Sequence, residues 1–240
     1  MLEQIRRHMM KKNISLVAGA ALLALSGLAS AQSAVGTTTV YVGLAHIDVN
    51  SKAAALSGGS KQFPEPGAQI RVGDQTTTGF GLVYRFAESW SGELVLGIPP
   101  SHKVYGNGVL ANAGQIAVVR QMPPTAFVNY HFGPLLPKLY PFVGLGVNYT
   151  YFEKTRSTAT GDAVSGGPTK IYLSNSWGAA AHVGFTLRYN ENWSLVGTAA
   201  YADVKSNMRA VTTTNTGEET LRTRINFRPM VYSLSLGYSF

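Results

Sequence analysis

The chain has 240 residues, a net charge of +8, 13% charged side chains and no cysteine. Without cysteine, neither disulfides nor thiolate metal sites are available, and the length fits one domain. Beyond the N-terminal region no segment is continuously apolar over the roughly 20 residues of a membrane-spanning helix, which excludes a helical membrane protein. The apolar residues, 45% of the chain, are instead dispersed in alternating form.

The first 31 residues have the order of an export signal. Basic residues come first, the apolar run Ile14 to Ala29 follows, and Ala29-Ser30-Ala31 ends the segment. The pattern predicts a signal peptide over residues 1–31, leaving residues 32–240 as one mature domain. A retained N-terminal anchor is the alternative, which the shortness of the apolar run disfavours. An exported chain is not expected to bind nucleic acid.

Eight segments alternate between apolar and small or polar residues, the period of a half-buried strand. Each is close to or above the roughly 9–11 residues that a tilted strand needs to cross the hydrocarbon. Together they predict an all-β fold, an eight-stranded antiparallel up-and-down transmembrane β-barrel. The segments are 38–47, 78–86, 90–98, 115–132, 140–152, 177–189, 193–203 and 222–240.

The connections between these segments are long and short in turn. Residues 50–75, 101–114, 153–175 and 205–221 are the long ones, and a short helical turn is expected near 170–174. Bacterial barrels have short periplasmic turns and long external loops, so the pattern predicts that both termini are periplasmic. The last strand, ending at Phe240, is expected to engage the barrel-assembly machinery.

Residue parity separates a lipid face from a lumen. Trp90, Trp177 and Trp193 fall at strand starts, where aromatic girdles lie. The lumen is expected to be lined by Gly79, Gly81, Gly144, Gly146, Asn148, Thr150, Gly184 and Thr186. Eight strands leave an interior barely wide enough for side chains, so an open aqueous pore is not expected.

Three charged residues fall on the lumen parity near the short-turn end: Arg85, Glu93 and Arg188. A buried carboxylate in a narrow interior needs a charged or hydrogen-bonding partner. We therefore predict a Glu93–Arg85/Arg188 cluster that closes the barrel floor, with a structural role favoured over proton relay.

Several strings resemble the outer membrane protein W family, small eight-stranded barrels of Gram-negative outer membranes that include the alkane-uptake protein AlkL. They are Ser101-His102-Lys103-Val104, Met122-Pro123-Pro124-Thr125, Tyr140 to Thr150, Asn175-Ser176-Trp177-Gly178 and Gly237-Tyr238-Ser239-Phe240. The resemblance implies an outer-membrane location and a role in passing small hydrophobic molecules inward. It departs at Thr198-Ala199-Ala200-Tyr201, where the family often has a bulky lumen aromatic, so a tight internal constriction does not carry over.

No catalytic or metal site is predicted, and no cofactor. Ser101 and His102 are adjacent on an extended chain, so their side chains point to opposite faces and cannot easily act as a nucleophile and its base. His46, His131 and His182 lie on separate strands without ligand spacing.

Two proline pairs suggest an opening in the wall. If the third and fourth predicted strands are level, with Trp90 opposite Phe132, then Pro99-Pro100 lie opposite Pro123-Pro124, within a residue or two. Proline donates no ladder hydrogen bond, so the upper part of this seam is expected to be unpaired. The predicted opening is bordered by Val95, Ile98, Pro99, Pro123, Pro124 and Thr125, with Ala200 in the pocket below. The alternative is that these prolines merely end the two strands at the membrane surface.

The leading functional hypothesis is passive uptake of small hydrophobic molecules, which enter from outside and leave laterally through the wall. The alternative is a structural or surface-interaction barrel without transport, whose loops bind lipopolysaccharide, phage or host ligands. The expected partners are outer-membrane lipids and lipopolysaccharide, small hydrophobic ligands and the assembly machinery.

Overall fold

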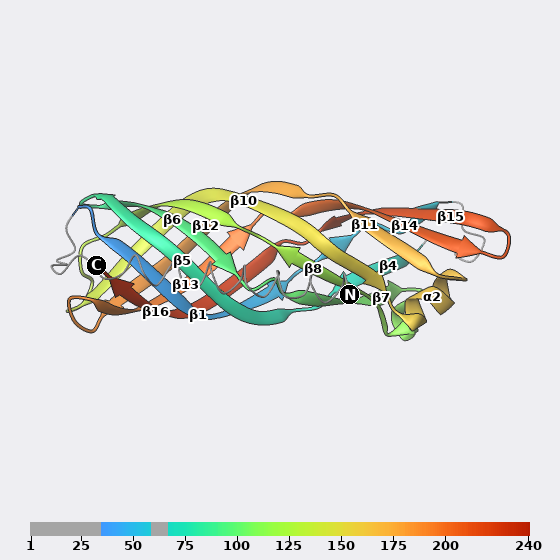
Figure 1. Cartoon of the computed structure of the whole chain (residues 1–240), viewed down its shortest axis with the longest axis horizontal. Helices are drawn as coiled ribbons and strands as arrows, with labels where there is room; N and C mark the ends of the chain where they lie inside the picture. Colours follow the sequence, from blue (N-terminus) through green and yellow to red (C-terminus); the bar gives the residue numbers. More distant parts are fainter. Residues whose placement is uncertain (1–34, 59–66) are drawn as a thin grey trace, which may run out of the picture.

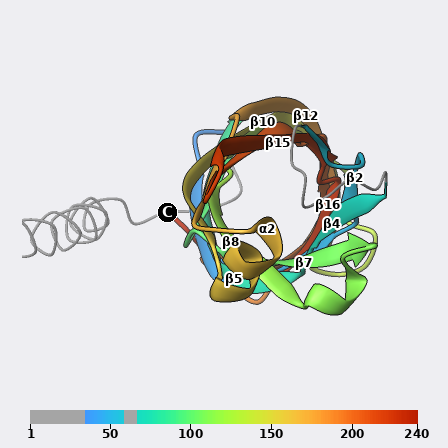
Figure 2. The same cartoon turned by 90° about the vertical axis from the view of Figure 1, so that its right-hand side faces the viewer.

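Eight of the described strands close into an antiparallel barrel, which confirms the predicted fold class. The computed structural model describes residues 35–58 and 67–240, so the predicted signal peptide lies outside the described residues. Around the ring the strands follow one another in chain order, and β16 pairs with β1 to close it. Figure 2 shows the closed ring end-on. They are β1 (Thr38–Val49), β5 (Gln75–Ala87), β6 (Trp90–Gly97), β9 (Thr125–His131), β10 (Leu139–Ser157), β12 (Ser176–Arg188), β13 (Trp193–Ala202) and β16 (Pro229–Ser239).

The long connections are themselves built of strands and extend the barrel wall at one end (Figure 1). On one side β4 (Ala68–Val72), β7 (Ser101–Gly108) and β8 (Gln115–Met122) continue the wall from β10. On the other side lies a second sheet. It contains β2 (Lys52–Ala53), β3 (Ser57–Gly58), β11 (Thr169–Leu173), β14 (Lys205–Thr214) and β15 (Gly217–Asn226).

The two short helices also belong to this extension. They are η1 (Ala111–Ala113) and α2 (Ala159–Ser165). The helical turn expected near residues 170–174 is therefore wrong, because that segment is strand β11, paired with β14. Among the described residues, neither helix has the length and apolar character needed to cross a membrane.

The opposite end, here called the turn end, carries the short connections and the C-terminus (Figure 1). Here β1 and β16 meet: the Phe240 amide donates to the Thr38 carbonyl oxygen at 3.0 Å, and the Thr38 amide donates to that of Phe240 at 3.1 Å. Long connections thus alternate with short ones around the ring, as predicted from the sequence. The end with α2 is called the extended end.

Two segments expected to be continuous strands are broken. Residues 115–132 divide into β8 and β9 at Pro123-Pro124, because proline lacks the amide that a ladder needs. Residues 222–240 divide into β15 and β16 at Phe227-Arg228, where Arg228 has a φ of +43° that turns the chain. In both places the chain leaves the extension and joins the barrel.

The two faces of the barrel follow the predicted parity. Exposed aliphatic and aromatic side chains cover the outside, and two sets of aromatic contacts mark its ends. Trp177 lies 4.7 Å from Tyr149 toward the extended end, whereas Trp193 lies 5.0 Å from Tyr238 at the turn end (ring centroids). Inside the barrel, small polar residues such as Ser91 and Thr150 are fully buried. This arrangement is that of a lipid-facing wall around a filled lumen.

The extension has its own apolar interior. Its buried cluster joins both sheets and includes Val49, Val72, Val104, Phe152, Met208, Leu221 and Phe227. Burial of this surface stabilises the strands that rise beyond the membrane, where water competes for their backbone hydrogen bonds.

Gly81 illustrates why the lumen needs small residues. It lies directly opposite Tyr41 in the β1–β5 register, and a methyl group built on it would collide with the Tyr41 ring. A methyl group built on Gly92 of β6 would meet no neighbouring atom. We expect Gly81→Ala to destabilise the barrel by about 1–3 kcal/mol through overpacking, and Gly92→Ala to leave it nearly unchanged. The stability of both variants can be measured by urea unfolding in detergent, with the heat-dependent shift in gel mobility as the readout. Equal stability of the two variants would contradict this account.

Candidate functional site

An apolar cavity of about 140 Å³ occupies the middle of the barrel and reaches toward the extension. Its inner wall is made by small and apolar side chains from opposite sides of the ring, including Ala45, Val95, Phe127 and Ala200. Ala200 stands among Thr198, Ala202 and Val231, so the space that a larger side chain would fill is open. Such a lining suits an apolar solute rather than an ion.

The ladder between strands three and four is interrupted beside this cavity. The β6–β9 pairing ends with Val95 opposite Thr125, and the β7–β8 pairing starts with Ser101 opposite Arg120. Both proline pairs, Pro99-Pro100 and Pro123-Pro124, fall within the unpaired interval. The sequence therefore predicted the position of the gap, here called the proline gap: residues 96–100 and 121–124.

The predicted register was wrong by two residues. Trp90 lies opposite Tyr130 and not Phe132, so continuing the β6–β9 register brings Leu96 opposite Pro124. Strands of a closed barrel are tilted and staggered, so neighbours need not be level at the turn end. The two proline pairs are consequently offset along the seam instead of facing each other.

Other groups satisfy the backbone at the proline gap. The Gln121 amide donates to the Pro100 carbonyl oxygen at 3.3 Å, and the Tyr149 amide donates to that of Pro124 at 3.0 Å. Thr125 Oγ1 donates to the Pro123 carbonyl oxygen at 3.1 Å. An unsatisfied backbone group in hydrocarbon costs several kcal/mol, and these bonds remove most of that cost. Because Tyr149 belongs to the aromatic girdle at the extended end, the interruption lies at that edge of the membrane-spanning wall.

Residues of both parities border the main cavity near the proline gap. Val95 faces inward, whereas Phe80, Leu96 and Ile98 lie on the outward parity, and Ile98 is 55% exposed. All four line the same cavity. Ile98 lies beyond the last residue pair of β6 and β9, so this part of the cavity lies beside the interrupted ladder.

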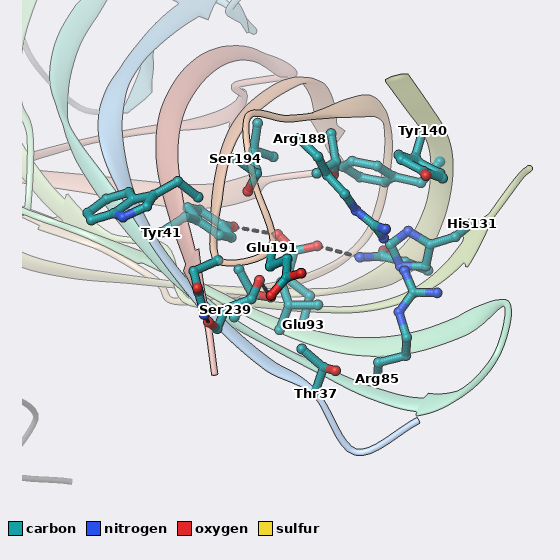
Figure 3. Close-up of a pocket in the computed structure, with 18 of the residues that line it drawn as sticks. Thr37, Tyr41, Arg85, Glu93, His131, Tyr140, Arg188, Glu191, Ser194 and Ser239 are labelled. Atoms are coloured by element: carbon teal, nitrogen blue, oxygen red, sulfur yellow. Dashed lines mark hydrogen bonds between the residues drawn. The ribbon is translucent and has the colours of Figure 1, made fainter. Parts of the chain in front are cut away.

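Below the cavity a layer of polar and aromatic side chains fills the lumen. Tyr41 Oη and Asn129 Nδ2 both donate to the Glu93 carboxylate, the second bond at 2.5 Å (Figure 3). The Asn129 side-chain oxygen accepts from His182 Nε2 at 2.7 Å, since the amide nitrogen is already used by Glu93. Phe127 stacks on the His182 ring with 3.9 Å between centroids. We call Tyr41, Glu93, Phe127, Asn129 and His182 the floor layer.

Each member of the floor layer is buried, and Asn129 is only 1% exposed. The layer spans the lumen because its members come from β1, β6, β9 and β12 on different sides of the ring. Gly144 on β10 leaves room for it, since a Cβ there would collide with Asn129 and His182. The buried carboxylate is held by two donors, which offsets the cost of removing it from water.

Between the floor layer and the turn end lies a smaller polar cavity of about 70 Å³. Arg85, Arg188 and Glu93 all line it, so the three residues predicted for the barrel floor do surround one space. Ion pairs do not join this cluster, however, because none of the ion pairs among the described residues links Glu93 to either arginine. Arg85 Nη1 donates to the Glu88 carbonyl oxygen at 2.5 Å, and Arg188 lies 4.0 Å above the Tyr140 ring.

Figure 3 shows Arg85 and Arg188 reaching from opposite sides of this space toward His131, while Tyr41 lies against Glu93. The sequence reasoning missed Tyr41 and Asn129 as partners. Their inward parity was readable from the sequence, but which side chains meet across a lumen depends on the stagger of strands that are not neighbours.

Of the residues predicted for the lateral opening, Val95, Ile98, Pro123, Thr125 and Ala200 line the main cavity. Pro99 and Pro124 belong to the proline gap without lining the cavity, and Pro100 lines it instead of Pro99.

The remaining candidate residues have local partners. His102 is buried between the Gly73 carbonyl oxygen (2.8 Å) and Gln121 (3.1 Å), while Ser101 is exposed on the other face. Within residues 35–58 and 67–240, no three side chains gather as a metal site would require.

Comparison with known proteins identifies the family. The OmpW family matches residues 34–240. The chain belongs to the OmpW family. Outer membrane protein W of Vibrio cholerae is 32% identical over 174 residues, covering 72% of this chain and 77% of that protein. Outer membrane protein AlkL of Ectopseudomonas oleovorans is 26% identical, covering 84% of this chain and 78% of its own. The crystal structure of OprG from Pseudomonas aeruginosa matches with a TM-score of 0.76 and 27% identity, covering 85% of this chain and 96% of that one.

Membership of the OmpW family places this barrel in the outer membrane, as predicted. The outward apolar band and its two aromatic girdles therefore face lipid. The proline gap is an interruption in this lipid-facing wall.

The floor layer depends on the Tyr41 hydroxyl. Tyr41→Phe leaves the buried Glu93 carboxylate with one donor fewer, and we expect a loss of about 1–3 kcal/mol in stability. Tyr84→Phe removes the same hydroxyl from an exposed position on the lipid face and should have little effect. The urea midpoint of the two variants in one detergent checks this, and a Tyr41→Phe barrel as stable as Tyr84→Phe would rule out the role given to this hydrogen bond.

Proposed function

We propose that this OmpW-family barrel passes small hydrophobic molecules across the outer leaflet and releases them sideways into the membrane. The observation that supports this most is the combination of an apolar cavity, a closed floor below it and an interrupted ladder in the wall beside it. A solute that cannot continue along the axis has the proline gap as its way out. The process is passive, and no catalytic step is proposed.

The proposal takes the extended end as external and both termini as periplasmic. Bacterial barrels place their short turns in the periplasm, and the turn end of this chain has the short connections and Phe240. In this orientation the extension rises through the polysaccharide layer. That layer is polar and slows apolar solutes, so a protein conduit through it has a function.

Apolar surface lines the route from the extended end. A cavity of about 60 Å³ beneath α2 is lined by Leu56, Ile116 and Ile171, and the apolar cluster of the extension separates it from the main cavity. Val49, Val72 and Phe227 of that cluster also line the main cavity. A solute would move by displacing side chains within apolar surroundings, without returning to water.

The driving force is the transfer of apolar surface out of water, worth roughly 25 cal/mol per Å². Because the cavity wall includes Phe80, Leu96 and Ile98 on the outward parity, the last step exchanges protein contacts for lipid contacts of similar polarity. The step is therefore nearly isoenergetic, and the concentration gradient sets the direction.

The alternative is a structural or surface-interaction barrel, and one observation favours an added role of this kind. The β-extension is a paired surface rich in exposed cations rather than a set of irregular loops. Lipopolysaccharide is the proposed partner of that surface, and the terminal strand β16 the proposed contact of the assembly machinery. Uptake of a panel of hydrophobic solutes by cells with and without the protein separates transport from a purely structural role.

Filling the main cavity tests the conduit. Ala200→Phe places an aromatic ring in the cavity, and we expect uptake to fall at least several-fold while the barrel still folds. Ala179→Phe is the control, because Ala179 lies on the neighbouring strand and faces outward. Uptake of a radiolabelled hydrophobic solute at equal surface expression measures both, and normal uptake by the Ala200→Phe protein would show that solutes do not use this cavity.

Cross-linking the proline gap tests the lateral exit. The chain has no cysteine, so a pair introduced as Leu96→Cys and Pro124→Cys is the only thiol pair present. Oxidising the two thiols to a disulfide should abolish uptake, and reducing that disulfide should restore it. The pair Leu94→Cys and Ala126→Cys joins the same two strands where they are already paired, and its cross-link should leave uptake intact. Uptake that survives complete cross-linking of the first pair would disprove the lateral exit.

A further inference from the structure

The outer face of the β11–β14–β15 sheet carries cations in successive rows. Lys205 and Lys52 flank Asn226 in the row nearest the barrel, and Arg224 stands in the next row opposite Asn207. Arg209 and Arg222 form the third row. Their exposed side chains alternate with buried ones, among them Met208, Leu221 and Ile225 of the apolar cluster, so the cations point away from the interior of the extension.

Arg209 and Arg222 are directly opposite each other in the antiparallel register. Like charges in this position destabilise a strand pair. Arg209 is also held in place, since its guanidinium lies 4.8 Å from the centre of the Tyr172 ring. A repulsive pair that the fold keeps in register is explained by an anion that both arginines contact.

Carboxylates of the described residues do not neutralise these rows. Asp203 pairs with Lys205 at the barrel edge, with 2.5 Å between Oδ2 and Nζ, and Glu218 lies in the hairpin at the far tip. None of the ion pairs found within residues 35–58 and 67–240 includes Arg209, Arg222 or Arg224. The three guanidinium groups are therefore available to an external partner.

The height of the rows identifies the partner. The Lys205 amide donates to Ser176 Oγ at 3.0 Å, so the lowest row begins level with Trp177 and its aromatic girdle. Arg209 lies four residues further along β14, which is roughly 13 Å at the usual rise of a strand. The rows thus span the headgroup region just outside the hydrocarbon. In the orientation proposed above, that region holds the phosphate groups of lipid A and of the inner core.

We propose that Arg209, Arg222 and Arg224 form a binding site for the phosphate groups of lipopolysaccharide. Arginine suits this ligand because its planar fork donates two hydrogen bonds to one oxyanion. A phosphate between Arg209 and Arg222 converts their repulsion into a bridge. The proposal rests on the external orientation of the extended end and does not depend on whether the barrel transports anything.

The test compares the purified barrel in neutral maltoside micelles alone, with rough lipopolysaccharide, and with the same lipopolysaccharide after removal of its phosphates. For the wild type we expect an upward shift of the unfolding temperature with intact lipopolysaccharide only. The double variant Arg209→Gln/Arg222→Gln should lose most of this shift and bind about tenfold more weakly. In micelles alone the same variant should be at least as stable as the wild type, because the like-charge pair is gone.

Arg156→Gln is the matched control, since Arg156 is an exposed arginine of the opposite sheet, on β10. It should keep the full shift. The site is disproved if the double variant keeps the shift, if Arg156→Gln loses as much of it, or if dephosphorylated lipopolysaccharide stabilises the wild type equally. An inorganic phosphate arm separates the sources: stabilisation by free phosphate at the same phosphorus concentration would assign the site to phosphate itself. A transport defect plays no part in any of these outcomes.

Discussion

Everything in this molecule depends on the requirement that no backbone amide or carbonyl be left unpaired in hydrocarbon. Eight strands meet that requirement by closing a ring, and the same requirement makes the proline gap unusual. The carbonyl groups at the gap are satisfied by the Tyr149 amide of β10, which donates to Pro124, and by the Gln121 amide across the seam, which donates to Pro100. The interruption is therefore a supported feature of the wall, and this is why a function can be assigned to it.

The narrow lumen imposes a second constraint, which divides the barrel into compartments. Small residues such as Gly81 and Gly144 provide the space that Tyr41, Asn129 and His182 occupy. Where the aromatic and polar side chains meet, the floor layer closes the axis; where the small side chain of Ala200 faces the lumen, the main cavity remains open. Alternation of large and small residues around one ring thus sets both the closed floor and the open space above it.

Much of this could be read from the sequence because parity and proline chemistry act locally. Strand number, the two faces, the alternating connections and the position of the proline gap all follow from residues close together in the chain. The partners of Glu93 could not be predicted, since they are fixed by strand stagger across the lumen and not by any local pattern. The β-extension was missed for a different reason: its outward positions are polar or charged, so segments such as β14 resemble loops in composition.

The pairing of β1 with β16 has a consequence for the biogenesis of the chain. Thr39 and Ser239 face each other in the ladder although 200 residues separate them in sequence. Closure of such a distant pair is slow and comes late, since a long stretch of chain must be ordered before the contact forms. The ring cannot be completed on a partly translocated chain, because until β16 arrives β1 keeps an open edge along its whole length. The barrel therefore closes only after its C-terminal strand, the last to leave the cell interior, has been exported.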